Sequence, residues 1–131
     1  MDGKLTFEEL SEEYRAMARN APNPIRPDLY KAMKTMLSDM ESSLRKAKEE
    51  NASETVQDGL RDRLRKSEQL SKAIIDMRVD YILKHRNIPD YVMTPEEKGL
   101  KAELDAIRES IVWDLTSYVM GVRDTVTGVS E

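Results

Sequence analysis

Helix-breaking residues are crowded into a few short segments of this chain, and their distribution constrains the fold more than any other feature. The 131 residues include five prolines and five glycines, and three of the prolines lie together at Pro22, Pro24 and Pro27. Proline removes a backbone donor and restricts the residue before it, so a helix is expected to end at such a cluster. Long stretches without breakers remain, and Gly59 weakens only the first turns of one of them.

Apolar residues recur every three or four positions along these stretches, which is the periodicity of an amphipathic α-helix. In residues 27–49 the repeat covers one face with Leu29, Met33, Met36, Leu37, Met40, Leu44 and Ala47. The same spacing predicts helices over residues 6–19, 53–84 and 94–122. We therefore expect an all-α fold, a bundle of about four helices with long second, third and fourth helices.

Capping residues mark the starts of two of these helices. Thr6 and Glu9 predict a capping box, in which each side chain accepts a hydrogen bond from the backbone amide of the other residue. Thr94 and Glu97 repeat this arrangement, and Pro95 falls at the first helical position, where its missing N–H costs nothing. These signals indicate where the first and last helices begin.

Composition excludes several classes of function. The chain has no cysteine, which rules out disulfide scaffolds, thiolate nucleophiles and cysteine-rich zinc sites. No apolar run approaches the roughly 20 residues that cross a bilayer, and the first residues lack the pattern of a signal peptide. The net charge of −4 argues against tight binding of nucleic acid by the whole domain. We expect a cytoplasmic protein without a membrane partner.

Catalytic and metal-binding patterns are missing from the sequence. The one histidine, His85, is expected at the end of the third helix, where a positive charge suits the helix dipole. Asp76 and Asp80 lie one turn apart, but a di-iron site in a helical bundle needs two Glu-x-x-His pairs. No glycine-rich phosphate loop or EF-hand spacing occurs. We expect no catalytic residue, no cofactor and no metal.

Basic residues give the third helix a cationic character, although acidic residues are interspersed among them. The cations are Arg61, Arg63, Arg65, Lys66, Lys72, Arg78, Lys84 and Arg86. They are spread around the helix rather than gathered in one stripe. A salt-bridged, solvated surface and a DNA-contacting patch are both open interpretations.

Surplus apolar residues predict that the chain associates with itself. The third helix widens its apolar face near Ile75, Tyr81 and Ile82, and the fourth adds Val112 and Trp113 beside its core stripe. One four-helix core is not expected to cover all of these side chains, and a large exposed apolar patch usually marks an interface. We interpret the five residues as a subunit interface, with burial of Trp113 in the core as the alternative.

An ordered set of segments resembles the helical domain of archaeal GINS proteins. It consists of Asp-Leu-Tyr at 28–30, Ile-Ile-Asp-Met-Arg at 74–78 with Ile82, and Met-Thr-Pro-Glu-Glu-Lys-Gly-Leu at 93–100. The order is that of the subfamily whose helical domain precedes a small β-domain. The resemblance implies a helical domain over residues 1–122 and a linker towards a β-domain at residues 123–131, with the β-domain itself absent or truncated.

The GINS resemblance also implies a function and a set of partners. The chain would be a non-catalytic subunit of a GINS-like replication complex, nucleoid-associated, that scaffolds the replicative helicase at the fork. Its partners would be itself or a related GINS subunit in a tetramer, the MCM helicase, and a RecJ-like or Cdc45-like protein. Direct DNA contact would be weak or absent. Arg78 matches a basic position of the family and is the candidate for contact with a partner or DNA.

Two other functions remain open at this point. The chain is also compatible with a generic helical adaptor or oligomerisation domain unrelated to replication. Residues 100–107 (Leu-Lys-Ala-Glu-Leu-Asp-Ala-Ile) resemble the opening helix of chorismate mutases, which makes a helical enzyme of that kind the minor alternative. That enzyme fold needs this helix first, whereas here it comes last.

Overall fold

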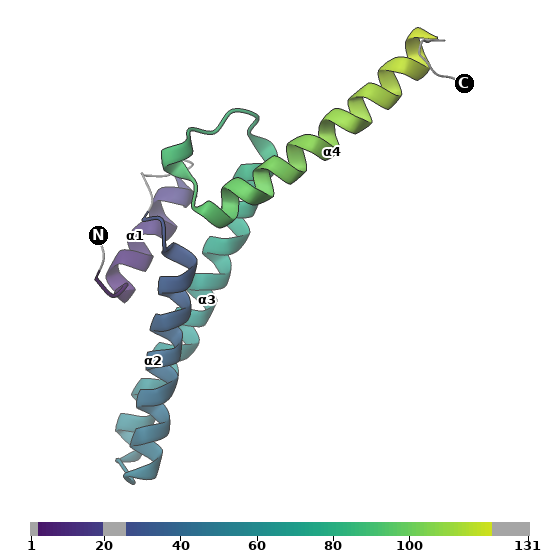
Figure 1. Ribbon diagram of the computed structural model, residues 1–131. Coiled ribbons are helices and arrows are strands. Elements are labelled where there is room, and N and C mark those ends of the chain that lie inside the picture. Colours follow the sequence, from purple (N-terminus) through teal and green to yellow (C-terminus); the bar gives the residue numbers. More distant parts are fainter. Residues whose placement is uncertain (1–2, 20–25, 122–131) are drawn as a thin grey trace. The chain divides into compact units, whose positions relative to one another are not determined.

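A computed structural model of the chain describes residues 3–19 and 26–121. These residues form four α-helices and one short 3₁₀-helix, namely α1 (Phe7–Ala18), α2 (Leu29–Glu49), α3 (Glu54–Lys84), η1 (Asp90–Val92) and α4 (Pro95–Met120) (Figure 1). No β-strand occurs in them. The predicted all-α class is confirmed, and α2, α3 and α4 are long, with 21, 31 and 26 residues. The expected linker at 123–131 lies outside the described residues.

Local hydrogen bonds of side chains explain how α1 and α2 begin. Thr6 Oγ1 accepts from the Glu9 amide at 3.1 Å and Glu9 Oε1 accepts from the Thr6 amide at 3.0 Å, which confirms the predicted capping box. The helix predicted over 27–49 begins instead at Leu29. The side chain of Asp28 makes no capping bond because its carboxylate accepts from Arg26, with Nε to Oδ1 at 2.6 Å.

The turn between α2 and α3 depends on Asn51. This residue has φ of 55°, in the left-handed region that asparagine tolerates better than most residues. The Ala52 amide donates to the Ala47 carbonyl at 2.9 Å, and the Asn51 amide donates to the Lys48 carbonyl at 3.2 Å. This pair of bonds is the Schellman arrangement, which satisfies the last carbonyls of α2. α3 then starts with Ser53 Oγ accepting from the Val56 amide at 3.2 Å.

The chain divides into two compact units, Met1–Pro95 and Glu96–Glu131. In the first unit α3 packs against both α2 and α1, and Figure 1 shows α2 running alongside α3. Its core consists of Leu5, Leu10, Leu29, Ala32, Met33, Met36 and Ile74. Much of the apolar stripe predicted for the second helix is buried there, so Met33 and Met36 fill a core rather than a binding surface.

α3 buries a stripe that is partly polar. The residues are Ser67, Ser71, Ile74, Arg78 and Ile82, which follow each other at helical spacing. The hydroxyls of Ser67 and Ser71 are buried and find no hydrogen-bond partner in the described part of the chain. A buried hydroxyl without a partner loses its bonds to water and gains nothing in return. These two positions therefore reduce the stability of the first unit.

We predict that Ser71→Ala raises the free energy of unfolding by up to about 1 kcal/mol, because it removes the unpaired hydroxyl and adds helix propensity. Urea denaturation followed by circular dichroism measures the change. Ser53→Ala is the matched control in the same helix. It removes a capping bond and should lower stability by about 1 kcal/mol. A loss of stability in Ser71→Ala would mean that its hydroxyl has a partner.

Candidate functional site

The most unusual surface of the chain lies on α4, in the unit Glu96–Glu131. Between Ile107 and Met120 this helix exposes eight large apolar side chains, which are Ile107, Ile111, Val112, Trp113, Leu115, Tyr118, Val119 and Met120. Tyr118 is 85% exposed and Trp113 is 66% exposed. Soluble proteins rarely expose a contiguous apolar patch of this kind unless it binds something. This segment is the candidate functional site.

The exposed apolar side chains cover two sides of α4. Ile111, Leu115 and Tyr118 follow each other at spacings of four and three, so they lie on one face. Trp113 is two residues from both Ile111 and Leu115, which places it about 200° away around the helix. Trp113 therefore lies on the opposite side of α4 and not, as predicted, beside the main stripe. Met120, seven residues later, shares that side with it.

The interface residues predicted on α3 have unequal surroundings. Ile75 is partly exposed at 41%, and Tyr81 is half-buried with its ring stacked on His85 at 4.1 Å between centroids. Ile82 is only 3% exposed, so it belongs to the interior of the first unit and not to its surface. Of the five predicted residues, the surface keeps Ile75, Val112 and Trp113. Their role as an interface stays a prediction.

Arg78 lies inside the first unit, and only 3% of it is exposed. Its Nη1 donates to Glu13 Oε2 at 2.6 Å, and its Nη2 donates to the Val92 carbonyl at 2.6 Å. The guanidinium thereby joins α1, α3 and η1. The expected contact of Arg78 with a partner or with DNA is corrected by this placement, because the charged group does not reach the surface.

Sequence reasoning missed the role of Arg78 and did not find Glu13. A signal was present, since Arg78 lies four residues after Ile74 and four before Ile82. Both isoleucines are core residues, so an arginine between them falls on the buried face of α3. A buried arginine needs an acidic partner. Which glutamate is the partner depends on how α1 packs against α3. The spacing of residues within α3 does not predict that packing.

The exposed cations of α3 are largely paired within the same helix. Arg61 Nη1 lies 2.7 Å from Asp58, Lys66 Nζ lies 3.0 Å from Asp62, and Arg65 pairs with the same Asp62. The hydrogen bond from Lys66 is the main reason why the pKa of Asp62 is lowered from its ordinary value. Such pairs favour the solvated, salt-bridged interpretation of this surface over a basic stripe for phosphates.

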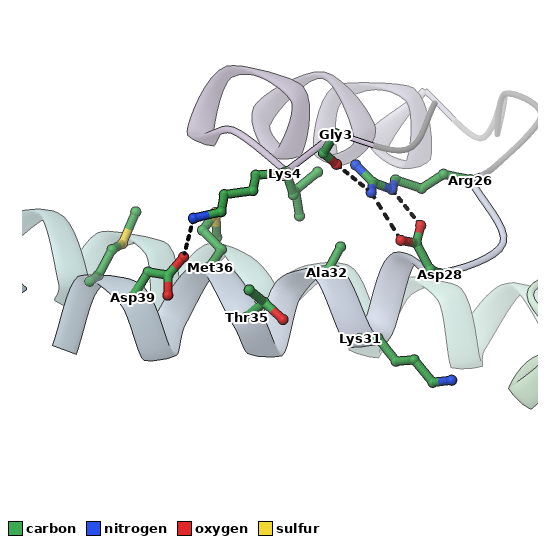
Figure 2. A pocket seen from close by; sticks show the side chains of 11 residues that line it. Gly3, Lys4, Arg26, Asp28, Lys31, Ala32, Thr35, Met36 and Asp39 are labelled. Carbon is green, nitrogen blue, oxygen red and sulfur yellow. Dashed lines mark hydrogen bonds and ion pairs between the residues drawn. The ribbon is translucent and has the colours of Figure 1, made fainter. Parts of the chain in front are cut away.

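A hollow of about 380 Å³ lies between the N-terminal segment and α2 (Figure 2). Lys4 Nζ reaches Asp39 Oδ2 across it at 3.2 Å, and Arg26 Nη2 donates to the Gly3 carbonyl at 2.7 Å and to Asp28 Oδ2 at 3.0 Å. The hydrogen bond from Arg26 lowers the pKa of Asp28 below its ordinary value of 3.8. Four charged side chains of the lining thus pair with each other, and they fasten the N-terminal segment to α2.

A second hollow, of about 300 Å³, lies beside the end of α3 and includes Asp80, Lys84 and His85. Its charges are also paired, since Lys84 Nζ is 3.1 Å from Asp80. His85 caps the C-terminus of α3 as expected, and its Nδ1 is 2.9 Å from the Tyr81 carbonyl. In the described residues no three metal-ligating side chains come together, and no helix is long and apolar enough to cross a membrane.

Comparisons of the chain with known protein families, with curated proteins and with solved structures find no match. The candidate site therefore rests on the chemistry of α4 alone.

We predict that Arg78→Met lowers the free energy of unfolding by about 3 kcal/mol, because it leaves the largely buried Glu13 carboxylate without its cation. Chemical denaturation measures the loss. Arg61→Ala is the matched control on the same helix. Its ion pair with Asp58 is exposed, so its loss should cost less than about 1 kcal/mol. Equal effects of the two substitutions would contradict the structural role of Arg78.

Proposed function

We propose that this chain is a non-catalytic assembly subunit that binds other protein chains through the exposed apolar part of α4. In its specific form, the proposal is a GINS-like scaffold that holds the replicative helicase at the fork, in the cytoplasm and at the nucleoid. The observation that carries the proposal is the run of exposed apolar side chains from Ile107 to Met120.

The solvation of α4 favours contacts with other protein chains. A helix that faces solvent on one side normally carries polar residues there, whereas a helix that is apolar on several sides is normally surrounded by protein. In α4 the main stripe includes Ile111 and Tyr118, and the opposite side carries Trp113 and Met120. Burying each large apolar side chain contributes roughly 1.5–3 kcal/mol. Association through this segment is therefore favourable, and contacts on two sides suit an oligomer larger than a dimer.

The other surface features support an assembly role rather than a ligand site. The hollow beside α2 and the hollow beside His85 both hold charges that already pair within the chain. The cations along α3 likewise pair with neighbouring acids. In the described part of the chain, the apolar surface of α4 is therefore the strongest candidate for an interaction site.

The replication role rests on the resemblance of residues 28–30, 74–78 and 93–100 to GINS proteins. It names the partners as a second copy or a related subunit, the MCM helicase, and a RecJ-like or Cdc45-like protein. A helical adaptor outside replication would use the same apolar segment, so helicase binding is the measurement that separates the two proposals.

We predict that the chain has a mass above the 15.1 kDa monomer in light scattering at micromolar concentration, and that it binds purified archaeal MCM helicase in biolayer interferometry. Tyr118→Glu should shift the mass towards the monomer, because it places a charge in the desolvated contact. Its helicity should persist, since Tyr118 is 85% exposed in its own chain.

Ser110→Glu is the matched control for this experiment. Ser110 is exposed on the same helix, between the main stripe and the side that carries Trp113, so a glutamate there should leave the mass unchanged. A monomer at all concentrations would refute self-association through α4. Self-association without any helicase binding would refute the replication role and favour the adaptor.

A further inference from the structure

We propose that α4 pairs with α4 of a second copy of this chain, parallel and in register. The inference rests on the proposed function, in that it takes α4 as an association surface, and it adds the partner and the orientation. Two independent features of α4 carry it, which are the repeat of its apolar residues and the distribution of charge along the edges of the apolar stripe.

The apolar stripe of α4 repeats every 11 residues. Leu100 corresponds to Ile111, Leu104 to Leu115 and Ile107 to Tyr118. Eleven residues make three turns and return to within about 20° of the same side of an α-helix. A repeat of this length keeps the stripe nearly straight along the helix, with slight right-handed drift. Such regularity is typical of a helix that packs lengthwise against another helix.

Exposure along the stripe shows where the second helix would lie. Leu100 and Leu104 are half-buried, whereas Ile107, Ile111, Leu115 and Tyr118 are all more than half exposed. The uncovered part of the repeat is therefore its second half. The same stripe in a second copy of the chain has the same length and spacing, so it can cover this part. A closed pair with twofold symmetry is also the commonest arrangement of identical chains.

Charged residues line the two edges of the stripe with opposite sign. Glu103 and Asp114, also 11 residues apart, follow one edge, and Arg108 lies on the other. All three are exposed, and within the described ranges neither Glu103 nor Arg108 has an ion-pair partner in its own chain. The pattern leaves Glu103 and Arg108 unpaired on opposite edges of an exposed apolar surface.

The orientation of the pair follows from these edges. In a parallel pair of helices, the edge that carries Glu103 in one copy faces the edge that carries Arg108 in the other. Glu103 of one copy therefore lies next to Arg108 of the second. Symmetry forms this contact twice. In an antiparallel pair each edge faces its own kind, which brings the acidic edges together and the basic edges together. Charge complementarity therefore selects the parallel pair.

Single-cysteine crosslinking tests the proposal, because the chain has no cysteine of its own. A disulfide needs Cα atoms within about 7 Å. In a parallel, in-register pair, Ile107→Cys and Tyr118→Cys each place a cysteine opposite its own counterpart. The two positions lie roughly 16 Å apart along the helix. An antiparallel pair can align at most one of them with itself.

We expect both variants to form a disulfide-linked dimer, at twice the 15.1 kDa mass, on non-reducing gels after mild oxidation. Ser110→Cys is the matched control. Ser110 is exposed one residue before Ile111, about 100° around the helix from it, so a cysteine there does not face its own counterpart across the stripe and should stay monomeric on the same gel. Circular dichroism of each variant checks that the helices are intact.

The possible outcomes separate this inference from the proposed function. A crosslink at one position only would overturn the parallel orientation. No crosslink at either position in a chain that light scattering finds oligomeric would overturn the pairing of α4 stripes, while self-association would stand. A chain that is monomeric at every concentration and gives no crosslink would refute both. Equal crosslinking of Ser110→Cys would show that the disulfides form by random collision between chains, and it would contradict the proposal.

A charge exchange provides a second measurement. Arg108→Glu should weaken the dimer by about tenfold at low ionic strength, because symmetry repeats the repulsion twice. The double variant Glu103→Arg with Arg108→Glu restores opposite charges across a parallel pair, so its dissociation constant should return towards that of the native chain. A double variant as weak as Arg108→Glu would overturn the proposed contact.

Discussion

The buried guanidinium of Arg78 is the interaction on which the first unit depends. It joins Glu13 of α1 and the carbonyl of Val92 to α3, so three separate segments meet at one charged group. α1 has only 12 residues and is too short to be stable as an isolated helix. Its position is fixed by this ion pair together with the burial of Leu10, Ala16 and Met17. Removing a charge from water is costly, so the ion pair gives specificity to the docking more than stability.

The two units use apolar side chains in opposite ways. In the unit Met1–Pro95 the apolar stripe of α2 is covered, and methionines adapt their shape to a core built by three segments. In the unit Glu96–Glu131, α4 carries apolar side chains on two sides and leaves those from Ile107 to Met120 exposed. The two helices therefore differ both in apolar pattern and in coverage. This difference explains why the first unit has the character of a folded core and α4 that of an association surface.

The helix positions could be predicted from the sequence because the residues that start and end a helix act locally. The capping box at Thr6 and Glu9, the start of α4 at Pro95 and the break before α3 involve contacts within a few residues. α2 begins at Leu29, two residues after the predicted start, because Pro27 and Asp28 form a turn in which the Leu29 amide donates to the Arg26 carbonyl. Of the candidate site, Val112 and Trp113 were found as surplus apolar residues. The assignment of Ile82 and Arg78 to a surface failed, because periodicity shows which residues share a face but not what covers that face.

The sequence by itself determined the all-α class, the four helices with the caps at Thr6 and Ser53, and the surplus of apolar residues on the last helix. These follow from hydrogen bonds and side-chain spacing within single helices, which need no distant partner. Only the tertiary structure decided that Arg78 is an internal ion pair, that the methionines of α2 are core, and that Ile107 to Met120 are uncovered. Those properties depend on segments far apart in the chain, such as Glu13 and Arg78, whose meeting is set by packing and not by any local pattern.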